Sequence, residues 1–88
     1  MAADTIRLDV DLTGQPSGLL RNRLIQSTLH AIGTTPTTVT FATDPDTGSG
    51  DVAAMVRAGL HRTGQLHGPV TVHGPTVTVT VNGDGDQP

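Results

Sequence analysis

The chain has 88 residues, a formal net charge of −3 and no cysteine. This length holds one small domain, and its core must be aliphatic because Phe41 is the single aromatic residue. The composition excludes disulfides, thiol chemistry and cysteine–zinc sites, and five scattered arginines without any lysine argue against a protein that binds nucleic-acid phosphates.

The first predicted strand covers residues 5–13, where apolar and polar residues alternate. Alternation with one polar side is typical of a half-buried strand. Gly14 begins a turn, and Ser17 is a good helix N-cap because its hydroxyl can accept a hydrogen bond from a free backbone N–H. Apolar residues at helical spacing predict a helix from there to about Ile32, with Gly33 as its left-handed end.

A second alternating segment, residues 37–43, predicts a strand that turns Phe41 toward the core. Residues 44–50 are rich in turn formers and predict a loop. A second helix is expected over about residues 51–62, since Asp51 near its start suits the helix dipole.

The last third of the chain contains a duplicated His-Gly-Pro unit and alternating valine and threonine. This pattern predicts a short strand over residues 70–73, a turn, and a last strand over residues 76–81, with the valines facing the core. Residues 84–88 are expected to form a polar tail beyond a single domain of residues 1–83.

The predicted element order is therefore β-α-β-α-β-β. Every strand has one apolar side and each helix has one apolar stripe. The economical arrangement is an α/β fold of the α+β two-layer sandwich type, a mixed four-stranded sheet with both helices on one face. The other face is then open to water, and its interaction candidates are Arg7, Asp9, Asp11, His73, Thr76, Thr78 and Thr80.

Two short motifs precede the predicted helices. Residues 11–14 read Asp-Leu-Thr-Gly, and residues 42–45 read Ala-Thr-Asp-Pro ahead of Asp51. With the element order, they resemble the TusA family of small sulfur-carrier proteins over about residues 6–81. The motif positions are Gly14, Ser17, Asp44, Pro45 and Asp51.

The resemblance implies the family's two-layer fold, but it does not extend to the family's chemistry. The persulfide-carrying cysteine of the family falls on Ser17, and the prolines of its Cys-Pro-x-Pro segment fall on Gly18 and Leu20. A thiolate is the required sulfur carrier, so no sulfur transfer is expected. The same element order also serves Alba-type chromatin proteins and the C-terminal domain of a bacterial initiation factor, which are basic.

Two catalytic or metal-binding interpretations compete with simpler ones. Ser17 as a nucleophile needs a base, and no nearby residue in the sequence supplies one, so the N-cap interpretation is favoured. His61, His67 and His73 recur every six residues and, with His30, suggest zinc. They fall on a helix end, a loop and a strand, so surface histidines are favoured and no metal is expected.

Two further patterns point weakly to ligands. Asp9 and Asp11 share one strand face, near His73 if the two strands are neighbours, and such carboxylates can hold a cation or do acid–base work. Solvated charges are the favoured interpretation. The Gly-Ser-Gly of residues 48–50 resembles a weak anion cradle but lacks the lysine of a phosphate-binding loop, so it is interpreted as a flexible loop.

The sequence favours a non-catalytic protein-interaction or accessory module over an enzyme, with no cofactor. One alternative is a small-ligand or nucleic-acid binder using the open sheet face. A second is a sulfur-relay partner protein that acts without its own cysteine. A protein partner or a second copy is expected, docking on the open face, or on the last strand if that strand lies at a sheet edge. A cytoplasmic location without membrane contact is expected, since no stretch approaches about 18 apolar residues.

Overall fold

The structure, a computed structural model, describes residues 5–14, 17–44 and 48–83. Its elements are β1 (Ile6–Asp11), α1 (Gly18–Ile32), β2 (Thr37–Ala42), α2 (Ser49–Thr63), β3 (Thr71–His73) and β4 (Thr76–Val81). The predicted β-α-β-α-β-β order is confirmed. The predictions for Pro45 and for the tail at 84–88 concern residues outside the described ranges.

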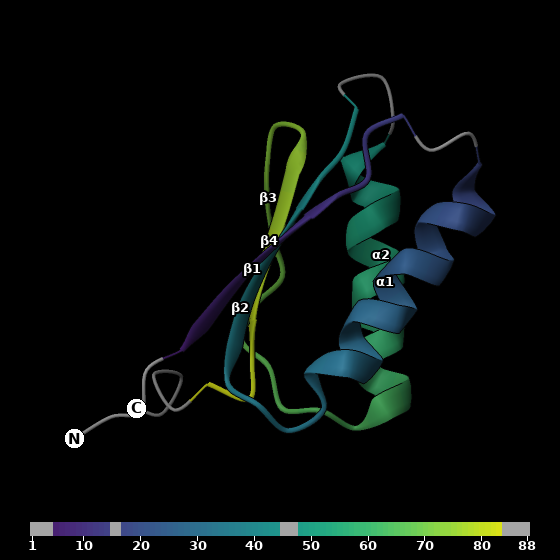
Figure 1. Ribbon diagram of the computed structural model, residues 1–88. Coiled ribbons are helices and arrows are strands. Elements are labelled where there is room, and N and C mark those ends of the chain that lie inside the picture. Colours follow the sequence, from purple (N-terminus) through teal and green to yellow (C-terminus); the bar gives the residue numbers. More distant parts are fainter. Residues whose placement is uncertain (1–4, 15–16, 45–47, 84–88) are drawn as a thin grey trace.

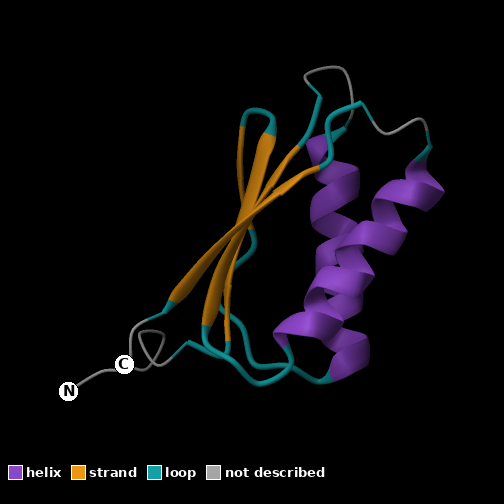
Figure 2. Ribbon diagram, viewed as in Figure 1, coloured by secondary structure: helices purple, strands orange, loops and turns teal. Residues whose placement is uncertain are grey.

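The four strands form one mixed sheet in the order β1-β2-β4-β3 (Figure 1). β1 and β2 run parallel, whereas β4 runs antiparallel to both of its neighbours. Both helices lie on the same side of the sheet (Figure 2). The predicted two-layer arrangement is therefore confirmed.

The last strand, β4, lies inside the sheet. One side of its backbone pairs with β2 along all six residues, and the other pairs with β3 and, further along, with residues 67–68. Docking through the last strand as a free edge is therefore wrong, because its backbone groups already have partners. The sheet edges are β1 and β3.

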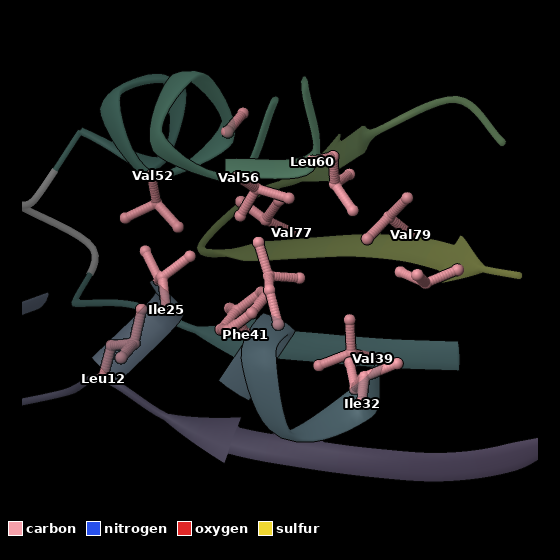
Figure 3. Packing of buried hydrophobic residues seen from close by; sticks show 13 residues of the cluster. Leu12, Ile25, Ile32, Val39, Phe41, Val52, Val56, Leu60, Val77 and Val79 are labelled. Atoms are coloured by element: carbon pink, nitrogen blue, oxygen red, sulfur yellow. The ribbon is translucent and has the colours of Figure 1, made fainter. Parts of the chain in front are cut away.

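The hydrophobic core lies between the sheet and the helices (Figure 3). Phe41 is fully buried within it, as predicted. The rest of this core consists of aliphatic side chains from the two helices, from the inner face of the sheet and from Leu12, which follows β1. These fully or almost fully buried side chains are Leu12, Ile25, Leu29, Val39, Val52, Val56, Leu60, Val77, Val79 and Val81.

Some residues of the predicted apolar stripes are not buried. Leu20 and Leu24 are each 38% exposed, because they lie on the opposite side of α1 from Gln26, which contacts α2. Val72 pairs with Val77 and shares its inward face, but it is 43% exposed because β3 is an edge strand. The predicted stripes were therefore wider than the buried surface.

The second helix begins earlier than predicted. The Gly48 carbonyl accepts hydrogen bonds from the N–H groups of Asp51 and Val52, at 2.9 and 3.3 Å, and these close the first turn of α2. Ser49 and Gly50 are helical. The flexible-loop interpretation of residues 48–50 is wrong for these two positions.

The C-terminal end of α1 is held by side chains from two distant segments. Gln65 donates hydrogen bonds to the carbonyls of Leu29 and Gly33, at 3.0 and 2.7 Å. Asn82 donates to the same Gly33 carbonyl at 2.7 Å. The Leu29 carbonyl also accepts the N–H of Gly33 at 3.3 Å, so Gln65 adds a second hydrogen bond there. The two amides connect the end of α1 to the segments that follow α2 and β4.

Candidate functional site

The open face of the sheet has paired threonines at its centre. Thr38 lies opposite Thr80, and Thr40 lies opposite Thr78. Their hydroxyl oxygens are 3.0 and 3.3 Å apart, respectively, within hydrogen-bonding distance. All four side chains are half-buried. The centre of the face is uncharged because it consists of threonines. The hydrogen bonds between their hydroxyl groups hold the side chains in order.

Ionisable side chains border this threonine face on both sides. Arg7, Asp9 and Asp11 are exposed along β1, and each pairs with a β2 residue of the open face. On the far border, His73 pairs with Thr76. An uncharged centre with an ionisable rim is the distribution of many protein interfaces, whose centres are depleted of charge. The predicted interaction residues therefore share one face.

The acidic residues of β1 do not meet His73. β1 and β3 occupy opposite edges of the sheet, with β2 and β4 between them. Three strand spacings of about 4.8 Å separate these edges, so the interpretation that Asp9, Asp11 and His73 are neighbours is wrong. Within the described ranges, no three His, Asp or Glu side chains gather closely enough to hold a metal ion.

The motif residues before the two helices form a structural junction. Asp11 accepts hydrogen bonds from the hydroxyl and the N–H of Thr13. Gly14 then takes a φ of 77°, in the left-handed region that favours glycine. Its N–H donates to Oδ2 of Asp44 at 2.9 Å, across 30 positions of the chain. The two motifs are thus joined through Gly14 and Asp44, which ties the ends of β1 and β2 together.

We expect the Thr13 hydroxyl to control the acidity of Asp11. Two hydrogen bonds from Thr13 lower the pKa of the Asp11 carboxyl below the ordinary value of 3.8. The bond from the Thr13 hydroxyl has the larger effect and the bond from its backbone N–H the smaller. Thr13→Val removes the hydroxyl donor, so the pKa of Asp11 should rise toward 3.8. Thr13→Ser keeps the donor and should leave the pKa low. The measurement is an NMR titration of the Asp11 carboxyl carbon.

The sign of the pH effect follows from this depressed pKa. The Asp11 contribution to stability is present above pH 3.8, where the unfolded carboxyl is already ionised, and is lost as the pH falls through the lower folded pKa. In Thr13→Val the folded pKa lies closer to 3.8, so this contribution should be smaller and its loss should be complete at a higher pH. A pKa of Asp11 that is equal in wild type and Thr13→Val would contradict the assigned cause.

Ser17 lies where the resemblance places a reactive cysteine, and its hydroxyl caps a helix. Its Oγ accepts a hydrogen bond from the Leu20 N–H at 3.2 Å, and its carbonyl accepts from the Arg21 N–H at 3.2 Å. The N-cap interpretation is therefore confirmed. Asp51 lies in the first turn of α2, as predicted, where its charge suits the helix dipole.

Comparison of the chain with protein-family models, with curated proteins and with solved structures finds no match. The TusA resemblance therefore rests on the motif residues and the element order alone. In the part of the chain that the structure describes, no helix combines the length and the apolar character needed to cross a membrane.

The sequence did not predict a groove between the two helices. Its volume is about 460 Å³, and its lining includes Arg23 and His30 from α1 together with Arg62 from α2. Two guanidinium groups and an imidazole make this groove able to attract an anion. Arg23 and His30 are exposed on one helix and Arg62 on the other, and the side-by-side packing of α1 and α2 brings them together.

Proposed function

We propose that the chain is a non-catalytic protein-interaction module on a TusA-like fold, and that the open sheet face is its docking surface. The observation that supports this is the uncovered threonine face, where Thr38 bonds to Thr80 and Thr40 to Thr78. Side chains that are already ordered lose little further entropy on docking. A protein partner with an uncharged centre and a cationic rim group for Asp9 and Asp11 fits this surface.

The alternatives receive less support from the same residues. A nucleic acid would bring phosphates against Asp9 and Asp11, whose charges repel them, and the face offers no aromatic ring for base stacking. Sulfur transfer by the chain itself would require a thiolate, and the chain contains no cysteine. The hydroxyl of Ser17, at the corresponding position, caps a helix. A sulfur-relay partner without its own cysteine would be one form of interaction module.

We expect charge on the threonine face to abolish docking. Thr78→Lys with Thr80→Lys places two cations at the centre of the face, opposite the uncharged centre of the partner. Binding should weaken about tenfold or more, because like or unpaired charges at an interface centre are costly. The measurement is quantitative capture by the immobilised chain, followed by titration of the captured protein once it is purified.

The matched control is Ala54→Lys with Ala58→Lys. Both alanines are exposed on α2, so this variant has the same added charge on a surface away from the open face. It should bind as the wild type does. Circular dichroism should show that both double variants remain folded. If both double variants bind the purified partner equally well, the open face is not the docking surface.

A further inference from the structure

No strand of the described ranges pairs with the outer edge of β1, which is six residues long. The N–H of Ile6 donates to the Pro36 carbonyl at 3.1 Å, and that of Leu12 donates to the Ala42 carbonyl at 2.8 Å. Because backbone direction alternates along a strand, the even-numbered residues bond to β2 and the odd-numbered ones turn their N–H and C=O groups outward. Arg7 and Asp9 therefore present backbone groups that a further strand can pair with.

The two edges of the sheet differ in protection. β3 is three residues long, with Pro69 and Pro75 close to its two ends, and short strands and prolines are devices that prevent pairing. β1 is twice as long and contains no proline. Its protection consists of charges on the outward-turned residues: Arg7 is cationic, and Asp9 and Asp11 are anionic. Such a pattern blocks some pairings and favours one.

We propose that a second copy of this chain docks antiparallel on the β1 edge, about a two-fold axis that passes beside Leu8. Arg7 of each copy then lies opposite Asp9 of the other. Both are outward-turned residues, so each such pair exchanges two backbone hydrogen bonds and also places opposite charges side by side on the open face. The two-fold axis produces this pair twice.

Neighbouring registers are disfavoured by the charged residues of β1. A shift of two residues one way places Asp9 opposite Asp9, although it also places Arg7 opposite Asp11 twice. A shift the other way places Arg7 opposite Arg7. Like charges directly opposite each other on a sheet are destabilising. A shift of one residue places outward-turned backbone groups opposite residues whose groups already bond to β2. Among the charged residues of β1, the Arg7–Asp9 register is therefore the one that forms two opposite-charge pairs and no like-charge pair.

The apolar side of the edge is also suited to a second copy. A hollow of about 210 Å³ lies beside β1, and its lining includes Ile6, Leu8 and Ala31. Ile6 is 55% exposed. Leu20 and Leu24 lie on the same side of α1 as Ala31, at helical spacing, and extend this apolar strip along the helix.

In the proposed register, Leu8 meets Leu8 of the second copy, and Ile6 meets Val10. The side chains at these non-hydrogen-bonded positions approach most closely across an antiparallel pair. Pairing would therefore remove exposed apolar surface from water on the helix side of the sheet, while it forms the charge pairs on the open side.

The inference goes beyond the proposed function, because it concerns an edge and a second copy rather than the open face and a different protein. The two can fail separately. Self-association belongs to the β1 edge if substitutions in β1 dissociate the dimer while Thr78→Lys with Thr80→Lys leaves it intact. This result would hold whether or not another protein docks on the open face.

The test is a charge-exchange cycle read by sedimentation equilibrium. Arg7→Asp and Asp9→Arg each place like charges at both cross-strand pairs, so each variant alone should dimerise about tenfold or more weakly than wild type. The chain with both substitutions restores opposite charges and should dimerise like wild type. An equimolar mixture of the two single variants should form the heterodimer, since their charges then complement each other. Both side chains are exposed, so the monomer should keep its fold.

A disulfide cross-link tests the register independently. Because the chain contains no native cysteine, an introduced cysteine can form a disulfide only with its copy in another chain. Only a residue on the two-fold axis meets itself, with Cα atoms about 4.5 Å apart at a non-hydrogen-bonded pair, which is within disulfide range. Leu8→Cys should therefore form a disulfide-linked dimer rapidly under mild oxidation. Thr71→Cys, exposed on the opposite edge, should do so only at the rate of random collision.

Three results would each overturn the proposal. The first is a wild type that stays monomeric up to millimolar concentration. The second is a dimer that neither single charge reversal weakens. The third is a Leu8→Cys chain that cross-links no faster than the Thr71→Cys chain.

Discussion

Replacing Phe41 with alanine should lower the free energy of unfolding by about 3–5 kcal/mol, the usual cost of removing a large buried aromatic side chain. The ring is fully buried between the sheet and both helices, and the chain has no second aromatic residue. A domain of this kind has a total stability of only about 5–15 kcal/mol. Phe41→Ala should therefore leave a large unfolded fraction near body temperature.

The measurement is urea unfolding followed by far-ultraviolet circular dichroism, since the chain contains no Trp or Tyr to report by fluorescence. Phe41→Leu is the matched control. It keeps most of the apolar volume and should cost about 1–1.5 kcal/mol. An alanine variant within about 1 kcal/mol of wild type would show that the ring does not organise the core.

Gly59→Val should destabilise the fold by about 2–3 kcal/mol through overpacking between the helices. A Cβ atom at Gly59 would lie 2.5 Å from Oε1 of Gln26 and 2.7 Å from Cδ1 of Leu29. Leu29 is fully buried, and the Gln26 amide donates to the Met55 carbonyl at 3.3 Å, so neither can withdraw without a loss. The small gain in helix propensity over glycine offsets only part of this strain.

Gly50→Ala is the matched control on the same helix. A Cβ atom there meets nothing within 4 Å, so only the helix propensity changes, and stability should rise by up to about 1 kcal/mol. Urea unfolding of both variants separates the two effects. Equal and small effects at Gly50 and Gly59 would contradict the close helix contact.

The order and type of elements could be predicted because alternation and helical spacing are local patterns. The order of the strands in the sheet could not be predicted in this way. Alternation indicates which face of the sheet a side chain lies on, but it does not indicate which strand is the neighbour. One local signal did bear on strand position: β1 carries charges, as edge strands often do, whereas β4 is uncharged.

The candidate site was partly predictable for the same reason. The open face follows directly from alternation, and its threonines and β1 charges were identified by residue. The hydrogen bond between Gly14 and Asp44 spans 30 positions, and no local pattern encodes it. The outward position of Leu20 and Leu24 depends on how far the sheet extends beneath α1, a quantity that helical spacing does not contain.

The interior position of β4 has a consequence for synthesis on the ribosome. β2 is complete long before Thr76–Val81 is made, so its antiparallel edge must wait for a partner. At about 5–20 residues per second, that wait is roughly 2–8 s. During it, the alternating Thr37–Ala42 segment offers unpaired backbone groups and an uncovered Phe41. The nascent chain is therefore most open to mispairing at β2, and an arrest before residue 76 should leave it aggregation-prone rather than partly folded.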